Sequence, residues 1–391
     1  VIFDVVLNDG SFTSADKNIT VINGGTASID AQSTDPEKGN ISFNNVTVQD
    51  TNDADHPSNL TFTADGKVTI TENLTVGSTE TSYEGQTPGL GNVVITADNG
   101  IEIGGNVTVL AGSTLTETAN GGDITVNGDS TISGSTITQT SEDGKITITG
   151  DETITGSEVT RTASDDISVG GDQSITNSNV NVTSENGDIT VAGNQTVTNS
   201  TVNVTADNGD ITVTGTQTVT GTAENPAVLN ETAAKGEITS GALIAENANV
   251  TKTAGNGITV NGNQSITNGT LTESTTAGDI LVDGNSSIIG STVTQNAENG
   301  KITITGDEAI SDSEVTRTAS DNVSVGGSQS ITNSVVDMIS ANGDITVGGE
   351  QTVSGTAENP AILNEIATNG AITSGALTAE NAIITKVAGN D

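Results

Sequence analysis

Acidic residues recur at one turn position of a repeated sequence pattern. Asp166, Asp188 and Asp210 occupy this position in three consecutive repeats. The same position is acidic elsewhere, at Asp123, Asp279 and Asp344. Carboxylates stacked at the spacing of neighbouring strands repel one another, and a hard cation such as calcium relieves that repulsion. The chain has neither the Gly-Gly-x-Gly-x-Asp nonapeptide of calcium-binding β-rolls nor an EF-hand loop. These Asp are therefore candidate calcium ligands, with solvated turn residues as the favoured alternative.

The same repeat predicts a column of hydroxyl side chains on one outer face. Such a column could form a flat ligand surface, including an ice-binding one, but Thr is also a common exposed strand residue. Leu281 interrupts the column, and no regular Thr-x-Thr pair is kept, so the second interpretation is favoured. The column comprises Thr125, Thr147, Ser168, Thr190, Thr212, Thr239, Thr259, Thr303, Ser324, Thr346 and Thr373.

Two insertions of about five residues break the repeat. They are copies of each other, at residues 224–230 and 358–364. Loops on a rigid scaffold often carry binding residues. The candidate contact residues are Glu224, Asn225, Pro226, Glu358, Asn359 and Pro360. A tolerated insertion whose Leu tucks back onto the core is the alternative.

The chain is strongly acidic. It carries 50 Asp and Glu against 10 Lys and Arg in 391 residues, for a formal net charge of −40. Nucleic acids and anionic membranes would repel it, and no apolar run is long enough for direct membrane insertion. The absence of Cys fits a chain that crosses a membrane unfolded and works in an oxidising compartment. An opening without Met indicates the interior of a longer, processed polypeptide.

Residue types needed for catalysis are scarce. Enzymes that cleave polysaccharides need basic groups, or a carboxylate pair with aromatic platforms, and here aromatic residues make up 1% of the chain. With one His and no Cys, nucleophilic dyads and most transition-metal sites are excluded. Arg161 and Arg317 are copies of one position, and each is expected to form a local ion pair. We therefore expect no enzyme, and no cofactor other than the candidate calcium.

Internal repetition is the main evidence for the fold. The phrase Gly-x-Ile-x-Val/Ile recurs about every 22 residues, which is about one coil of a parallel β-helix. Its central Ile or Val is found at Ile124, Ile146, Ile167, Ile189, Ile211, Ile238, Ile258, Ile280, Ile302, Val323, Ile345 and Ile372.

Within one repeat, residues 186–207, apolar and polar residues alternate in three short runs separated by Asn-Gly, Ala-Gly and Asn-Ser pairs. This alternation is typical of half-buried strands joined by turns. The residues predicted to face inward are Ile189, Val191, Val197, Val202 and Val204, and those predicted to face solvent are Thr190, Thr196 and Thr198. Helical spacing is absent, and an immunoglobulin-like array would need a repeat of about 100 residues with aromatic cores. The predicted fold class is all-β, a right-handed parallel β-helix (β-solenoid) with three short strands per coil.

The sequence also contains a longer duplication, which spans several of the short repeats. Residues 144–152 reappear at 300–308, an offset of 156, whereas residues 224–227 reappear at 358–361, an offset of 134. The difference is one coil of 22 residues. A whole coil can be gained or lost only where each coil contacts just its neighbours, as in a solenoid.

The N-terminal hundred residues are less regular. Strand-like phrases occur at 40–43, 59–62, 67–70 and 93–96, and Pro36, Pro57 and Pro88 lie in the linking segments. We therefore predict irregular β-helical coils with protruding loops over residues 1–98, and a regular β-helix over residues 99–391. The chain stops at a coil boundary, and we expect further coils in the full-length protein.

The tandem coils resemble a known group. Coils such as Gly209-Asp210-Ile211-Thr212-Val213-Thr214-Gly215, with the bias toward Thr, Asn, Gly and Asp, are similar to filamentous-haemagglutinin-like large exoproteins and autotransporter passenger domains of Gram-negative bacteria. The resemblance covers about residues 91–391 and lies in the pattern. It implies export through an outer-membrane partner, an extracellular or cell-surface location, and a role in adhesion, aggregation or biofilm.

These observations lead to two functional expectations. The first is a structural or adhesive rod segment of a large secreted or cell-surface adhesin, which binds a host or neighbour-cell surface ligand. The second is a self-assembling extracellular filament or sheath subunit, which binds other copies of itself. A calcium- or ice-binding β-solenoid is a further alternative.

Overall fold

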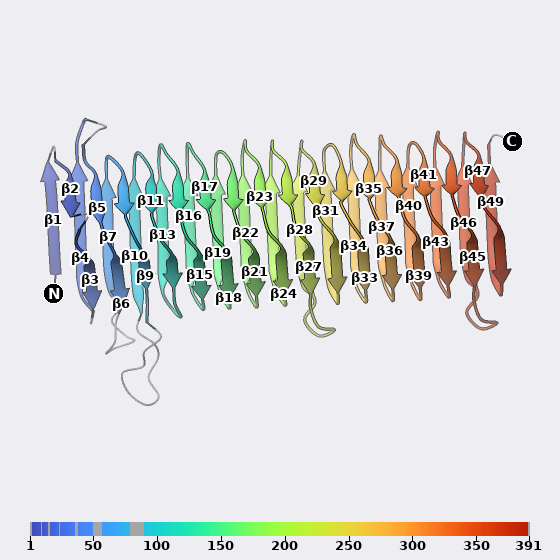
Figure 1. The fold of residues 1–391 in the computed structure, drawn as a ribbon, viewed down its shortest axis with the longest axis horizontal. Helices are drawn as coiled ribbons and strands as arrows, with labels where there is room; N and C mark the ends of the chain where they lie inside the picture. Colours follow the sequence, from blue (N-terminus) through green and yellow to red (C-terminus); the bar gives the residue numbers. More distant parts are fainter. Residues whose placement is uncertain are drawn as a thin grey trace, which may run out of the picture. The chain divides into compact units, whose positions relative to one another are not determined.

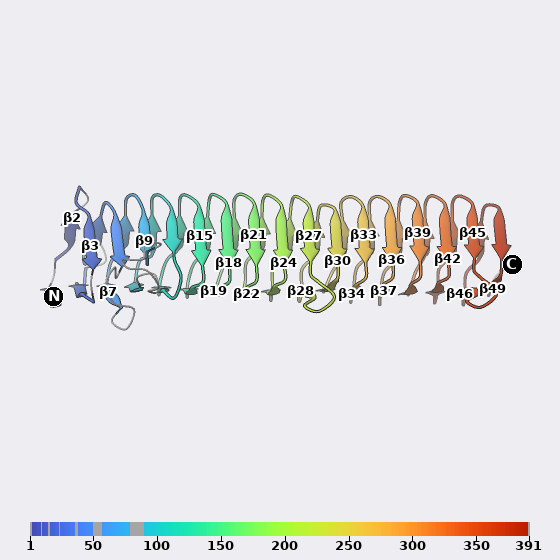
Figure 2. The same ribbon diagram turned by 90° about the horizontal axis from the view of Figure 1, so that it is seen from below.

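The computed structural model describes residues 2–8, 10–14, 16–22, 24–35, 38–49, 57–78 and 90–389. These residues form β-strands and no helix, and they divide into two compact units, Val1–Gly193 and Asn194–Asp391. Within each unit, three strands and their turns make one coil, and each strand pairs in parallel with its equivalents one coil before and after (Figure 1, Figure 2). The predicted parallel β-solenoid, with about 22 residues and three strands per coil, is confirmed.

Unit 1 contains three parallel sheets, here named A, B and C. Sheet A consists of β1 (Ile2–Asn8), β4 (Thr26–Gln32), β7 (Ser58–Ala64), β10 (Gly91–Ala97), β13 (Thr114–Ala119), β16 (Thr136–Ser141), β19 (Glu158–Ala163) and β22 (Asn179–Ser184). Sheet B consists of β2 (Phe12–Ser14), β5 (Ile41–Phe43), β8 (Val68–Ile70), β11 (Ile101–Ile103), β14 (Ile124–Val126), β17 (Ile146–Ile148), β20 (Ile167–Val169) and β23 (Ile189–Val191). Sheet C consists of β3 (Ile19–Ile22), β6 (Val46–Gln49), β9 (Leu74–Val76), β12 (Val107–Val109), β15 (Ser130–Ser133), β18 (Glu152–Thr155) and β21 (Gln173–Thr176).

Unit 2 repeats the arrangement. Its sheet C strands are β24 (Gln195–Thr198), β27 (Gln217–Thr220), β30 (Leu243–Glu246), β33 (Gln264–Thr267), β36 (Ser286–Ile289), β39 (Glu308–Ser311), β42 (Gln329–Thr332), β45 (Gln351–Ser354) and β48 (Leu377–Glu380). Its sheet A strands are β25 (Thr201–Ala206), β28 (Ala227–Ala233), β31 (Ala248–Ala254), β34 (Thr270–Thr275), β37 (Thr292–Ala297), β40 (Glu314–Ala319), β43 (Val335–Ser340), β46 (Ala361–Ala367) and β49 (Ala382–Ala388). Its sheet B strands are β26 (Ile211–Val213), β29 (Ile238–Ser240), β32 (Ile258–Val260), β35 (Ile280–Val282), β38 (Ile302–Ile304), β41 (Val323–Val325), β44 (Ile345–Val347) and β47 (Ile372–Ser374).

The repeated Ile or Val sets the register of sheet B. It is the first residue of each sheet B strand from β14 onward, and in unit 1 Ile146 pairs directly with Ile124 and Ile167. Since side chains alternate along a strand, an inward Ile fixes an outward Thr beside it. The predicted facing of residues 189–204 is confirmed: Val197 is fully buried, and Thr196 is half-buried on the outer face.

Coils in the N-terminal part of unit 1 are longer. The sheet B partners Val68 and Ile101 are 33 residues apart, against 22 for Ile124 and Ile146. The four predicted strand phrases fall on β5, β7, β8 and β10. Stacked Phe rings fill the core here, with the centroid of Phe43 5.5 Å from that of Phe62. Pro36 and Pro88 lie outside the described residues, and the protruding loops and the boundary at residue 98 stay predictions.

The turn from sheet C to sheet A requires a left-handed residue. Asn177 has φ 49° and Asp312 has φ 51°, and Gly156 occupies the same position at φ 59°. Asn, Asp and Gly adopt this conformation at low cost, whereas other side chains clash with the backbone. A Ser follows the left-handed residue: Ser157 Oγ accepts the N–H of Ser135 at 3.1 Å and donates to the Thr155 carbonyl at 2.8 Å. The short polar pairs at this position are therefore turns, as predicted.

Candidate functional site

The predicted Asp column lies in the turn that precedes sheet B. In unit 1, Asp166 Oδ1 accepts the backbone N–H of Asp188 at 2.9 Å, and its other carboxylate oxygen lies 2.5 Å from Lys145 Nζ. In unit 2, Asp210 Oδ1 accepts the N–H of Glu237 at 2.8 Å. The Lys145 ammonium, followed by the Asp188 N–H, holds the pKa of Asp166 below its usual value. Each carboxylate thus caps a backbone donor of the next coil.

These capping contacts bear on whether the Asp column could bind calcium. Among the described residues, no group of three or more His, Cys, Asp or Glu side chains is placed to hold a metal ion. Asp166 and Asp210 each accept a backbone N–H, and Asp166 is also paired with the Lys145 ammonium group. The calcium interpretation of Asp166, Asp188 and Asp210 stays a prediction, and the capping contacts give Asp166 and Asp210 a structural role.

The first half of each insertion forms an exposed loop between sheet C and sheet A of unit 2, and the second half lies in β28 or β46. Thr222 Oγ1 accepts the N–H of Asn225 at 3.0 Å, and Thr356 Oγ1 accepts the N–H of Asn359 at 2.9 Å. The Leu that follows the first loop, Leu229, is fully buried, as is its copy in the second loop. The predicted Leu anchoring is therefore confirmed. Figure 1 shows the two loops protruding between β27 and β28 and between β45 and β46.

The second loop contributes to a surface hollow. Asn359 lines a shallow concavity of about 360 Å³ together with Asp312, Glu314 and Asn333. Its side-chain amide also donates to the Asn333 carbonyl at 3.4 Å. Glu224, Pro226, Glu358 and Pro360 are exposed or nearly so, and they remain predicted contact residues.

The Thr column is present on the outer face of sheet B. In unit 1 Thr147 pairs with Thr125 and Ser168, and Ser168 Oγ donates to Thr147 Oγ1 at 3.4 Å. In unit 2 Leu281 stands in the column between Thr259 and Thr303, as predicted. Ice binding remains untested.

The interior of unit 1 holds a charged network that sequence analysis only partly anticipated. Arg161 forms the expected ion pair, with Glu152, and both side chains are buried. The guanidinium contacts both carboxylate oxygens, one of them at 2.8 Å from Nη1, and Nε donates to Gln139 Oε1 at 2.6 Å. Gln139 in turn donates to Glu117 at 2.6 Å, and Gln173 donates to Glu152 at 2.8 Å. Four successive coils are thereby linked from inside.

Burial changes the acidity of Glu117. This carboxyl group is fully buried, and burial raises its pKa to about 7, against the opposing effects of Gln139 and Arg161. Its Oε1 has no hydrogen-bond partner among the described residues. Loss of hydration favours the neutral form of this carboxyl group, and the hydrogen bond from Gln139 and the charge of Arg161 offset only part of that effect.

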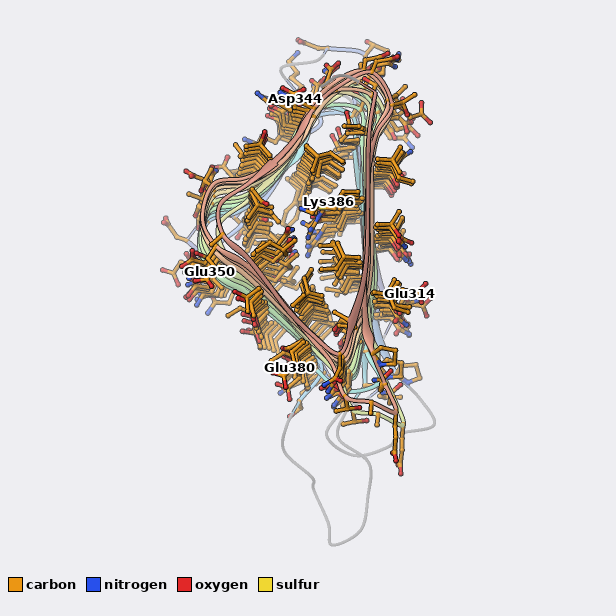
Figure 3. All side chains as sticks on the ribbon, turned by 90° about the vertical axis from the view of Figure 1, so that its right-hand side faces the viewer. Glu314, Asp344, Glu350, Glu380 and Lys386 are labelled. Atoms are coloured by element: carbon orange, nitrogen blue, oxygen red, sulfur yellow. The ribbon has the colours of Figure 1, made fainter. Side chains whose placement is uncertain are left out.

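Unit 2 contains a copy of this network at an offset of 156. Arg317 pairs with Glu308 at 2.5 and 2.9 Å, its Nε donates to Gln295, and Gln295 donates to Glu273 at 2.6 Å. Burial raises the pKa of Glu273, as it does for the equivalent acid of unit 1. Unit 2 adds two Lys–Glu pairs, Lys252 with Glu231, which is fully buried, and Lys386 with Glu365, in which the Glu is buried and the Lys is partly exposed. In the end view of Figure 3, Lys386 points into the coil, while Glu314, Asp344, Glu350 and Glu380 lie on its outside.

One signal could have located these interior residues. Arg161 stands two residues after the buried Val159 and two before the buried Ala163, so strand alternation alone places it inside. Gln195 and Gln217 likewise stand two residues before a buried Val. Inward positions are therefore found from their place in the strand alternation, and a search for apolar residues alone misses them.

The fold and these ladders define a β-solenoid repeat protein. Comparison with known proteins adds no narrower class: no protein-family model, curated protein or solved structure significantly matches the chain. Within the described residues, no helix is both long and apolar enough to cross a membrane.

Proposed function

We propose that this chain is a segment of a stiff structural or adhesive rod in an extracellular or cell-surface bacterial adhesin. One observation carries the proposal. In each unit, three parallel sheets and stacked buried side chains join successive coils in register, and such coils are expected to resist bending. Each coil adds about 4.8 Å of length. Repetition of this kind extends a protein without altering its local structure.

Two features support an adhesive role. The surface is strongly acidic: the chain carries 50 Asp and Glu against 10 Lys and Arg, and four of those ten cations pair with buried Glu. The loops after β27 and β45 protrude from this surface, and Asn359 lines a hollow beside Asp312 and Glu314. A cell-surface ligand rich in hydrogen-bond donors or positive charge would suit this site.

Electron microscopy of the purified chain at several concentrations, with and without millimolar calcium, tests the proposal. Isolated particles of fixed length support the rod. Filaments that lengthen with protein concentration would favour the alternative, a self-assembling filament or sheath subunit. Calcium-dependent association would give the Asp column a binding role.

The adhesive role is tested by binding of the fluorescently labelled chain to bacterial and epithelial cells. A variant with Gly-Ser-Gly in place of residues 224–226 and 358–360 should bind less than the natural chain. Thr346→Ser, on the outer face of sheet B, is the matched control and should bind normally. Equal binding by the loop variant would remove the loops from the proposal.

A further inference from the structure

Three side chains form a closed hydrogen-bonded ring in the interior of unit 2. Lys252 Nζ lies 2.6 Å from Gln217 Oε1 and 2.5 Å from Glu231 Oε2, and Gln217 Nε2 donates to Glu231 Oε1 at 2.7 Å. One carboxylate therefore touches both an amine nitrogen and an amide nitrogen. All three side chains are at most 1% exposed, so water is excluded from the ring.

The same three residue types meet a second time, all shifted by 134, with the Lys–Glu contact there an ion pair in which Glu365 Oε2 accepts no hydrogen bond among the described residues. Lys386 Nζ lies 2.7 Å from Gln351 Oε1 and 2.6 Å from Glu365 Oε2, and Gln351 Nε2 donates to Glu365 Oε1 at 2.7 Å. Here the Lys side chain is 24% exposed and the Glu 1%. Two positions of the chain thus repeat one chemical arrangement of amine, carboxamide and carboxylate.

We propose that each ring forms an intramolecular isopeptide bond, joining Lys252 to Gln217 and Lys386 to Gln351. The amine nitrogen attacks the amide carbon, the new N–C bond forms, and the bond from that carbon to Nε2 breaks with release of ammonia. No oxidant, reductant or further reactant is needed.

The geometry suits this reaction. The amide carbon is one C=O bond of about 1.2 Å from Oε1, so Nζ lies within about 3.8 Å of the carbon it would attack. Positioning at such a distance replaces a bimolecular encounter with an intramolecular step. The dry interior also keeps water from competing as the nucleophile.

Glu231 is positioned to move the protons. Its Oε2 takes a proton from the Lys252 ammonium group, which makes the amine nucleophilic, and its Oε1 delivers a proton to the departing Nε2. Of the five protons on the two nitrogens, three leave with ammonia, one stays on the new amide nitrogen, and one remains on the Glu231 carboxyl group. Glu365 has the same relation to Lys386 and Gln351.

The Arg networks provide an internal contrast. Arg161 and Arg317 also contact a buried Glu and a Gln, but guanidinium keeps its proton in proteins and is not a nucleophile. These two sites should therefore remain non-covalent. In a chain without Cys, the two Lys rings would supply covalent ties between successive coils.

Mass spectrometry of the folded, purified chain tests the proposal. The intact mass should fall below the sequence mass by one ammonia for each bond. Trypsin should cut after Arg161, Lys235 and Lys301 but not after Lys252, so that peptide 162–235 stays joined to peptide 236–301. This joined species decides the question, because succinimide formation at an Asn-Gly pair also releases ammonia without joining peptides.

Variants separate the roles within the ring. Lys252→Met should abolish the joined species and leave the Lys386 bond intact, and Lys301→Met, at an exposed Lys, should leave both bonds unchanged. Glu231→Gln should abolish or greatly slow the joining, and a bond that forms equally fast would overturn the role assigned to Glu231. Cleavage after Lys252 with an unmodified peptide 162–235, from a chain that circular dichroism shows to be folded, would overturn the proposal.

Discussion

Gln139 donates a hydrogen bond of 2.6 Å to Glu117 across two adjacent coils of unit 1, at a site where both side chains are buried. Gln139 is uncharged and cannot neutralise the Glu117 carboxylate. The contact also leaves one oxygen of Glu117 without a hydrogen bond among the described residues. The interior of this unit therefore contains a titratable carboxyl group as well as packed apolar side chains.

This relationship predicts a pH-dependent stability. The pKa of Glu117 is about 7 in the folded chain against an ordinary value of 4.5. The folded state binds the proton more tightly, so the contribution of this group is fully present below pH 4.5 and is lost as pH rises through 7. The loss should reach about 3 kcal/mol by pH 8. Glu117→Gln should remove this component from urea unfolding measured between pH 4 and pH 8, whereas Glu142→Gln, at an exposed turn residue, should not.

The buried ion pair of Arg161 and Glu152 predicts unequal effects of single and double substitution. Arg161→Met leaves a buried carboxylate without its cation and should destabilise the chain by about 3–5 kcal/mol. Adding Glu152→Leu should recover most of that loss, since an apolar pair needs no compensation. Chemical unfolding of Arg161→Met, Glu152→Leu and the double variant measures the coupling, and additive losses would contradict the buried pairing.

The Asp column predicts a difference between two substitutions of Asp166. Asp166→Asn keeps an oxygen that can accept the Asp188 N–H, whereas Asp166→Ala leaves that donor without its partner at a cost of about 1 kcal/mol. Thermal unfolding should rank the natural chain and Asp166→Asn above Asp166→Ala. Calorimetric titration with calcium on the same proteins tests the metal interpretation. That interpretation requires a heat of calcium binding in the natural chain that is smaller in Asp166→Asn.

The lowered pKa of Asp166 gives a further test by NMR titration. Its main cause is the Lys145 side chain, so Lys145→Met should raise the pKa of Asp166 toward its usual value. Because the folded pKa is depressed, any stability from this group is present above the unfolded pKa and is lost as pH falls through the folded value. An unchanged pKa in Lys145→Met would contradict the ion pair.

The left-handed turn predicts a strong dependence on side-chain type at Asn177, where φ is 49°. Asn177→Gly should change stability by a few tenths of a kcal/mol, as Gly already occupies the equivalent position at Gly156. Asn177→Val should cost about 1–2 kcal/mol because its branched Cβ clashes in this conformation. Thermal melts of the two variants give the comparison, and equal melting temperatures would place the turn in another conformation.

The sequence by itself determined the coil. Ile124, Ile146 and Ile167 recur every 21 or 22 residues, and each is followed by Thr or Ser and then by another apolar residue, which predicted a parallel β-solenoid. Local alternation was sufficient because each strand repeats the same two-residue periodicity. It also located both protruding loops, since an inserted segment interrupts a regular period.

Only the tertiary structure decided what the polar residues do. Asp166 and Glu231 are both acidic residues in a strongly acidic chain, yet one caps a backbone N–H at a turn and the other lies in the dry interior against Lys252. Their partners are 22 and 21 residues away, so the repeat predicts that they lie in neighbouring coils but not which donor each carboxylate contacts. Stacking of coils brings such residues to hydrogen-bonding distance, and the loss of water there gives their charges and nucleophilicity new consequences.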